Sequence, residues 1–328
     1  MKANLEISTK KSIHSLDTLE LTLDFFQNKS HEKQYYKAIR KFKTSSKILS
    51  IIDSIPNDTQ AQKRYWKTYH CNSVLLQDGN KFTGSLCRKR FCAECCRIKT
   101  AELTNAYKQP ILDLGQLYFV TLTTPNVTGS NLKKEIQKMI KAFQLIKNNI
   151  RKTYKIKLNG MRKIEITYNQ DSNTYHPHLH LIQDNLEASN LIQALWLKQF
   201  KKASIKGQDI RSIDTSNENA FIELFKYATK ETTKDGKQYN GEVLHTIYSS
   251  IQGQRIYQTY GLIKKEAQPI EAKQNEIELF ITPEKKDIWI YEHDQKDWIN
   301  AEWNALVNTL EIERQKTTQK LISLPTEN

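Results

Sequence analysis

Three of the chain's eight histidines stand at every second position of one short run, Tyr175–Ile182. Successive side chains of a β-strand point to opposite faces, so this spacing predicts a strand that presents His176, His178 and His180 on one face. Neutral imidazole is the commonest metal ligand, and imidazoles side by side predict a divalent-metal site. The alternative is a set of hydrogen-bonded structural histidines, which is the more frequent role of a lone histidine.

The strand expected just before this run offers a third ligand. Glu165 lies within residues 161–168, an alternating stretch that predicts a strand. An acidic side chain between apolar neighbours is costly without a partner, and either a metal or an Arg or Lys would provide one. Mixed His and carboxylate ligation accommodates Mg²⁺ or Mn²⁺, which would hold a phosphate oxygen as a Lewis acid.

The three histidines are not equivalent as ligands. His178 and His180 flank a single leucine and are the preferred pair beside Glu165. His176 precedes Pro177 at the start of the strand, where it is expected to contact phosphate or support the site. Its own metal ligation, and with it the identity of the third ligand, stays open.

A second group of polar residues follows in 219–229, whose pattern predicts a helix. Glu223 and Tyr227 are four residues apart and would share a helical face, with Lys230 three residues further on. A tyrosine hydroxyl with a pKa of about 10 is a poor nucleophile, but nearby positive charge lowers that pKa and a carboxylate can take the proton or activate water. The alternative is an ordinary amphipathic helix with solvated Glu and Lys and a packed tyrosine.

The five cysteines favour a metal site over a disulfide framework, because their number is odd and four of them crowd into residues 87–96. A Cys-x2-Cys pair with two further thiols nearby is typical of structural tetrahedral zinc. The expected ligands are Cys71, Cys87, Cys92 and Cys95, with Cys96 as the spare. A reduced cluster without metal is the alternative, and a reducing cytoplasm is the expected compartment.

The net charge of +14 is unevenly spread along the chain. Residues 266–328 hold 13 acidic and 7 basic residues, which leaves 43 basic and 23 acidic residues in 1–265. A basic body predicts a polyanionic partner, foremost nucleic acid. A lysine-rich composition inherited from an AT-rich genome is the alternative. We find no signal peptide pattern and no membrane-spanning apolar window, so no membrane partner is expected.

Alternating patterns between 111 and 265 predict the order β-α-β-β-α-β-α, an α+β fold in which an antiparallel, ferredoxin-like sheet carries helices on one face. The strands are expected at 117–124, 161–168, 177–182 and 209–214, and the helices at 131–150, 187–202 and 219–229. Four successive regions are expected: a helical N-terminal region at 1–63, a Cys-rich zinc unit at 64–110, the sheet domain at 111–265 and an acidic C-terminal region at 266–328.

Four motifs in this order resemble the rolling-circle replication initiators (Rep) of small plasmids of Gram-positive bacteria, which belong to the wider His-hydrophobe-His (HUH) endonucleases. The motifs are Phe119–Thr123, Glu165–Thr167, His176–His180 and Glu223-x3-Tyr227-x2-Lys230. The segment Cys87–Cys95 is also similar to that family's. The resemblance covers about 65–265 and identifies 111–265 as an HUH catalytic domain.

The resemblance implies a specific reaction. A metal held by the histidine pair would orient a scissile phosphate of single-stranded or extruded DNA at the plasmid double-strand origin. Tyr227 would attack it, leaving a 5′-phosphotyrosyl link and a free 3′-OH that primes synthesis. Glu223 would activate water for the terminating cleavage. A host helicase and replication machinery are the implied protein partners, and the oligomeric state stays open.

Three other functions remain open from the residues alone. An HUH relaxase or single-tyrosine transposase would use the same chemistry, although relaxases usually place their tyrosine near the N-terminus. A non-catalytic, zinc-containing DNA-binding regulator would use the histidines and Tyr227 structurally. A metallohydrolase acting on small molecules would use the histidines but has no need of so basic a body.

Overall fold

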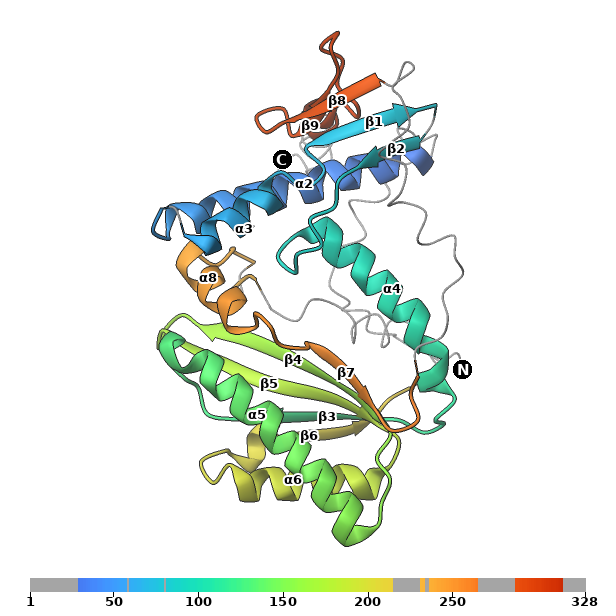
Figure 1. Cartoon of the computed structure of the whole chain (residues 1–328), viewed down its shortest axis with the longest axis vertical. Coiled ribbons are helices and arrows are strands. Elements are labelled where there is room, and N and C mark those ends of the chain that lie inside the picture. Colours follow the sequence, from blue (N-terminus) through green and yellow to red (C-terminus); the bar gives the residue numbers. More distant parts are fainter. Residues whose placement is uncertain are drawn as a thin grey trace, which may run out of the picture. The chain divides into compact units, whose positions relative to one another are not determined.

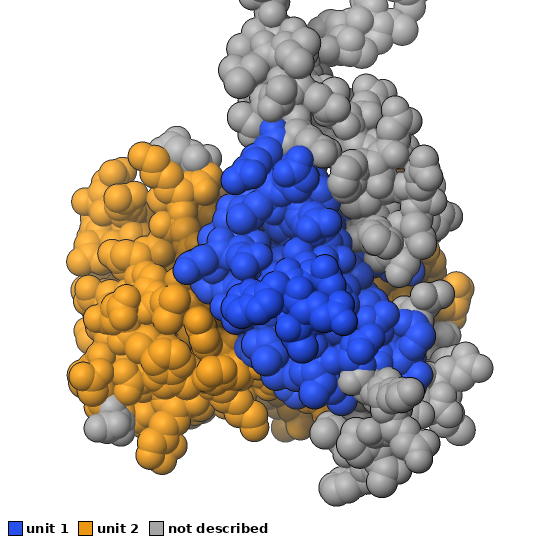
Figure 2. All heavy atoms as spheres, turned by 90° about the horizontal axis from the view of Figure 1, so that it is seen from above, with its two compact units in different colours: residues 1–43, 71–85, 283–328 blue, residues 44–70, 86–282 orange. Residues whose placement is uncertain are grey.

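The computed structural model describes residues 29–57, 59–79, 81–214, 231–233, 236–264 and 287–314. The chain divides into two compact units, each assembled from separate stretches of sequence (Figure 2). The first unit takes residues 1–43, 71–85 and 283–328, and the second takes 44–70 and 86–282. The four regions expected from the sequence are successive along the chain, whereas each unit combines stretches from more than one of them.

The fold is mixed α+β with two antiparallel sheets, which confirms the fold class at that level (Figure 1). The helices are α2 (Lys29–Asp53), α3 (Gln60–Tyr69), α4 (Ala93–Leu112), α5 (Gly129–Asn149), α6 (Leu186–Gln199) and α8 (Gly241–Ser250), with short η1 (Ile150–Tyr154) and η2 (Ile205–Gly207). The strands are β1 (Val74–Asp78), β2 (Lys81–Gly84), β3 (Tyr118–Thr123), β4 (Gly160–Asn169), β5 (Thr174–Gln183), β6 (Asp209–Ser212), β7 (Tyr257–Tyr260), β8 (Asp287–Glu292) and β9 (Asp297–Ile299).

The larger sheet belongs to the second unit and has the strand order β6-β3-β5-β4-β7, with every neighbouring pair antiparallel. Along the chain its elements run β3, α5, β4, β5, α6 and β6, followed by β7 after α8. The helix predicted at 219–229 lies outside the described residues. Gly160 is required where β4 meets β5, because a Cβ there would lie 2.0 Å from the carbonyl oxygen of Ile182.

Helices α5 and α6 cover one face of this sheet (Figure 1). The face is apolar because alternate residues of the strands point to it, among them Leu122, Ile164 and Leu179, all 1% exposed or less. Their partners on α5 recur every three or four residues, which is the spacing of one helical face. The buried residues of α5 are Leu132, Ile136, Met139, Ala142, Phe143 and Ile146.

The opposite face of the sheet is polar along most of β5, since the residues between the leucines are histidines. At one end of this face Met161 and Ile182 form a separate small core with Ile111 from the last turn of α4. The histidines occupy the rest of β5 toward its start. The sheet therefore has one face for stability and one that can present ligands.

The smaller sheet belongs to the first unit and has the order β2-β1-β8-β9. Its core joins Leu75, Trp289 and Trp298 to Tyr35 and Ala38 of α2. The sequence analysis assigned no strand to 266–328, yet β8 and β9 both lie there. Strand β8 pairs with β1, more than 200 residues earlier in the chain, and β9 joins the sheet by pairing with β8, so this sheet depends on a contact that no local pattern shows.

No helix in the described residues is both long enough and apolar enough to cross a membrane.

Candidate active site and cysteine cluster

The imidazoles of β5 lie on the sheet face that α5 and α6 do not cover. In the antiparallel register His178 lies opposite Glu165 of β4. His180 lies opposite Lys163 of the same strand. Directly paired residues share a face and hold their Cβ atoms about 5 Å apart. The sheet therefore brings together ligands that the sequence supplied from two separate motifs.

The three preferred ligands converge. Glu165 Oε1 lies 3.6 Å from His178 Nε2, and Glu165 Oε2 lies 3.5 Å from His180 Nε2. One ligand atom from each residue lies within 4.8 Å of the other two. Metal–ligand distances near 2.1 Å place such atoms at that mutual spacing around one cation. The donor set of one carboxylate and two imidazoles fits Mn²⁺ or Mg²⁺ with positions left over for other oxygens.

Hydrogen bonds orient both rings for this role. The Nδ1 atom of His178 lies 3.2 Å from the carbonyl oxygen of His176, which can only accept, so Nδ1 carries the proton and Nε2 keeps its lone pair. His180 Nδ1 lies 3.2 Å from Thr121 Oγ1. A partner on the far nitrogen is the usual support of a metal-ligating histidine, because it fixes the tautomer and the ring orientation.

His176 lies beside the ligand group rather than in it. Its ring centroid is 5.4 Å from that of His178, and its backbone carbonyl orients His178 as described above. Burial and the neighbouring His178 lower the pKa of His176, which favours its neutral form. A supporting role fits this position.

Lys163 is a site residue that the sequence analysis missed. Its Nζ atom lies 3.2 Å from Glu165 Oε2, and its side chain is only 5% exposed. Burial alone would raise the pKa of Glu165, but the contact with His178 and the charge of Lys163 outweigh it and bring the pKa to about 2. The alternating pattern of β4 could have identified it, because Lys163 stands two positions before Glu165 and so shares its face.

His180 is neutral in these surroundings. Burial lowers its pKa to about 4, and the nearby His178 acts in the same direction. At neutral pH the site therefore offers an ionised carboxylate and a neutral imidazole, which are the protonation states that a metal ion needs.

Three of the four cysteines expected to bind zinc lie together in the second unit. The Sγ atoms of Cys87, Cys92 and Cys95 lie within 4.8 Å of one another, and all three side chains are buried; Cys71, also buried, belongs to the first unit. Cys87 Sγ and Cys95 Sγ are 3.7 Å apart, and the backbone N–H of Arg88 donates to Cys95 Sγ at 3.2 Å. A backbone N–H aimed at sulfur stabilises a thiolate, so these three donors fit a tetrahedral zinc ion for which Cys71 stays the predicted fourth ligand.

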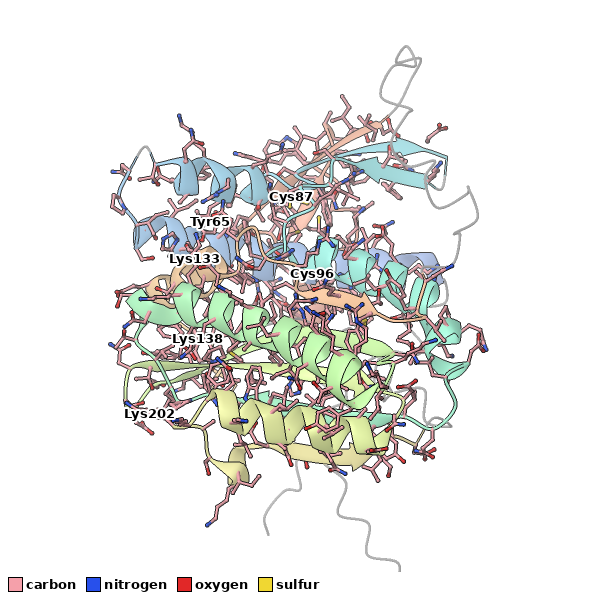
Figure 3. The ribbon with its side chains drawn as sticks, turned by 60° about the horizontal axis from the view of Figure 1, so that its bottom comes forward. Tyr65, Cys87, Cys96, Lys133, Lys138 and Lys202 are labelled. Atoms are coloured by element: carbon pink, nitrogen blue, oxygen red, sulfur yellow. The ribbon has the colours of Figure 1, made fainter. Side chains whose placement is uncertain are left out.

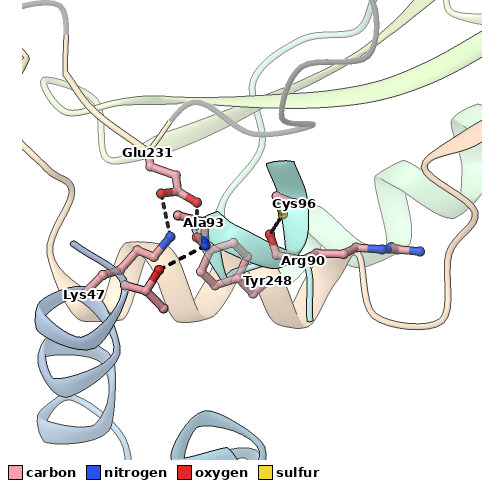
Figure 4. A network of polar contacts seen from close by, with 7 residues as sticks. Lys47, Arg90, Ala93, Cys96, Glu231 and Tyr248 are labelled. Carbon is pink, nitrogen blue, oxygen red and sulfur yellow. Dashed lines mark hydrogen bonds and ion pairs between the residues drawn. The ribbon is translucent and has the colours of Figure 1, made fainter. Parts of the chain in front are cut away.

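Cys96 stands apart from this group, as expected. Both Cys96 and Cys87, a member of that group, are labelled in Figure 3. Its Sγ donates to the carbonyl oxygen of Arg90 at 2.8 Å (Figure 4). Burial raises the pKa of Cys96 to about 12, so the thiol stays protonated. A protonated thiol is neither a good ligand nor a nucleophile.

Glu223, Tyr227 and Lys230 lie outside the described residues. The described residues resume at Glu231. Its carboxylate accepts a hydrogen bond from Tyr248 and forms an ion pair with Lys47 at 2.7 Å (Figure 4). Burial, and then the charge of Glu231, raise the pKa of Tyr248 well above its ordinary value, so this phenol remains a donor. Glu231, which follows Lys230 in the sequence, is therefore half-buried and held by two polar contacts.

Comparison with known proteins decides the family. A sequence model described as replication protein matches residues 80–308, a span that contains the histidine strand and most of the cysteine motif. The chain belongs to the replication protein family. The family predicted from the four motifs, that of plasmid replication initiators, is confirmed.

Curated relatives agree with this assignment. A protein named Protein rep from Bacillus amyloliquefaciens is 26% identical over 218 residues, which cover 56% of this chain and 64% of the relative. Protein rep from Streptococcus pneumoniae serotype 2 is 25% identical over 214 residues, covering 58% and 66%. One from Staphylococcus aureus is 28% identical over 187 residues, covering 49% and 80%. The chain thus spans slightly less than two thirds of the first two relatives, and no solved structure matches it.

Proposed function

We propose that this replication protein initiates rolling-circle replication of a plasmid by nicking and rejoining origin DNA through Tyr227. The observation that carries the proposal is the convergence of His178, His180 and Glu165 on the sheet face that α5 and α6 do not cover. Three protein ligands leave positions for a substrate oxygen, which is the arrangement of a catalytic site rather than a structural one.

The strand and helix order supports an HUH-type domain. The elements β3, α5, β4, β5, α6 and β6 follow the order expected from the sequence, and β3 and β4 flank the histidine strand on its two sides. This arrangement lets β4 contribute Glu165 to a site whose histidines lie on β5. The relaxase and transposase alternatives share this chemistry, so the family assignment, and not the site, favours an initiator.

The proposed reaction is a transesterification. The phenolic oxygen of Tyr227 attacks the scissile phosphorus, a P–O bond to tyrosine forms, and the bond from phosphorus to the 3′ oxygen breaks. The phenolic proton leaves to water, and the departing 3′ oxygen takes up a proton from water and becomes the primer hydroxyl; Glu223 activates the water of the terminating cleavage. The positive charge of Lys230 would lower the pKa of the phenol.

Glu165, His178 and His180 would hold a Mn²⁺ or Mg²⁺ ion, which when bound polarises a phosphate oxygen as a Lewis acid. The contacts on their far sides, from the carbonyl of His176 and from Thr121, keep the two rings turned toward Glu165. These residues thus fix where a phosphate would be gripped. For the cysteine cluster we propose a structural zinc ion.

The test is a labelled single-stranded origin oligonucleotide incubated with the protein and Mn²⁺. We expect nicking and a covalent protein–DNA product, both lost in Tyr227→Phe while DNA binding is retained, because only the attacking oxygen is removed. Tyr239→Phe is the matched control, since this tyrosine packs in the hydrophobic core and its replacement should leave nicking intact. Unchanged nicking by Tyr227→Phe would overturn the assigned nucleophile.

Glu223→Ala tests the terminating step separately. The first nick should survive, whereas release of the DNA from the protein should fail, because water is no longer activated. A variant that terminates normally would remove this role from Glu223.

A further inference from the structure

A group of exposed lysines gathers at one end of the helical layer of the second unit. Lys138 lies on α5, and Lys201, Lys202 and Lys206 lie in the segment that joins α6 to β6. All four are exposed, and we call them the lysine cluster. Lys133, also exposed, lies on the same side as Lys138 and Lys202 in the view of Figure 3.

The joining segment is held firmly to α5 and to the sheet. Lys138 Nζ lies 4.9 Å from the ring centroid of Phe200, the residue directly before Lys201. The Phe200 ring packs on Trp196 with centroids 4.4 Å apart. The indole N–H of Trp196 in turn donates to the carbonyl oxygen of Thr123 at 2.8 Å. The segment that carries these lysines is therefore packed firmly against α5 and the sheet.

The same segment reaches the strand next to the candidate active site. Gln208 is buried, accepts a hydrogen bond from the backbone N–H of Thr123 at 2.8 Å and donates to Thr123 Oγ1 at 3.0 Å. Gly207 packs so closely on Thr123 that a Cβ would lie 2.7 Å from its hydroxyl. Thr123 is the register partner of His178. The lysine cluster thus begins one strand away from a metal ligand.

Almost all charged residues in and around this segment are basic. Between residues 186 and 208 the sole acidic residue is Glu187, at the opposite end of α6. Asp209, at the start of β6, lies 3.8 Å from Arg211, which partly offsets its charge. Several exposed ammonium groups suit a repeating anion, the phosphates of a nucleic acid strand, better than a single small ligand.

We propose that the lysine cluster binds the sugar–phosphate backbone of the DNA strand next to the phosphate that a cation held by His178, His180 and Glu165 would bind. The inference rests on the proposed function and extends it with a path for the flanking DNA. Contacts of this kind position the strand without reading its sequence, since every nucleotide carries the same phosphate.

The test compares two triple variants of the full chain that remove the same charge. Lys201→Gln, Lys202→Gln and Lys206→Gln remove most of the cluster. Lys152→Gln, Lys155→Gln and Lys157→Gln remove three exposed lysines that follow the opposite end of α5. Binding of a fluorescent single-stranded origin oligonucleotide is measured in EDTA, where no cleavage interferes, over a series of salt concentrations.

The cluster variant should bind more weakly, and the slope of log affinity against log salt should fall by about 2, because about 0.7 counterion is released for each phosphate contact on single strands. The control variant should keep both the affinity and the slope. An equal loss in the two variants would overturn the proposal and leave net charge as the cause, and so would no loss in the cluster variant.

Failure of the proposed function has a different signature. If the wild-type protein formed no covalent product with Mn²⁺, the nicking assignment would fall. The contrast between the two triple variants would still decide whether the cluster binds DNA.

Discussion

The two ligand groups of this replication protein differ in the type of donor and in exposure. In the second unit the cysteine cluster offers the sulfur atoms of Cys87, Cys92 and Cys95, all on buried side chains. The sheet site offers one carboxylate and two imidazoles, and the side chains of Glu165 and His180 remain 12% and 16% exposed. With the predicted ligand Cys71, four thiolates would complete a tetrahedral shell, whereas three mixed ligands leave it open.

This difference in ligands and exposure indicates which of the two sites can catalyse a reaction. A closed site of thiolates has no place for a substrate and contributes to folding. An open site on a sheet face can exchange its metal and accept a phosphate oxygen. On the proposed function, the chain would separate a structural metal from a catalytic one by ligand type and by burial.

The largest effect is expected at the cysteine cluster. Replacing both Cys92 and Cys95 with Ser should reduce zinc from about one ion per chain to none, measured by elemental analysis. Thermal unfolding should shift down strongly, because structural zinc contributes on the order of 10 kcal/mol in small zinc domains. Cys96→Ser is the control and should keep its zinc. The absence of zinc from freshly purified wild-type protein would contradict the proposal that the cysteine cluster is a structural zinc site.

The second-largest effect is expected on the rate of nicking and not on stability. His178→Ala should slow Mn²⁺-dependent nicking on the order of 10³-fold, since a metal supplies several kcal/mol of charge stabilisation to the transition state. The melting temperature without metal should change little in comparison with the cysteine variant. His70→Gln, which removes a histidine outside the ligand group, should nick normally. A His178→Ala protein that nicks at the wild-type rate would show that the sheet site is not the catalytic one.

The sequence predicted the sheet site better than it predicted the rest of the molecule. The period-two histidines of β5 and the placing of Glu165 on the preceding strand depend on local alternation, which the sequence displays directly. Lys163 was missed because a lysine in an alternating strand looks like a solvated residue until its cross-strand partner is known. β8 was missed because it pairs with a strand more than 200 residues away, and β9 was missed with it because β9 pairs with β8. The sequence predictions for Glu223, Tyr227 and Lys230 stay predictions.

A smaller effect is expected in the pH dependence of stability without metal. The folded protein holds the pKa of His180 near 4, below the value of about 6.5 of an unfolded chain. The unfolded chain thus binds more protons between these values, and stability falls as the pH drops from 6.5 to 4, by no more than about 3 kcal/mol. Burial is the main cause of this shift, the neighbouring His178, Lys163 and Arg211 add to it, and Glu165 opposes it.

Denaturant unfolding at pH 7 and pH 4.5 measures this loss, and His180→Asn should reduce it. An equal loss in the variant would mean that other groups cause it.

The smallest effect is expected from Lys163. Its ammonium group competes with a metal for Glu165, so Lys163→Met should bind Mn²⁺ more tightly, by about tenfold at an effective dielectric constant near 20 with partial screening. Calorimetric titration with Mn²⁺ measures the change. Lys163→Arg keeps the charge and should bind as the wild type does. Weaker binding by Lys163→Met would mean that Lys163 chiefly holds Glu165 in place.

The most direct test of the central claim is to identify the residue that becomes linked to DNA. The wild-type protein is incubated with the origin oligonucleotide and Mn²⁺, digested with protease, and the peptide that carries the nucleotide is sequenced by mass spectrometry. The account predicts a link to Tyr227 that disappears in EDTA and in His178→Ala. A link to another residue, or one that forms equally well without metal, would contradict it.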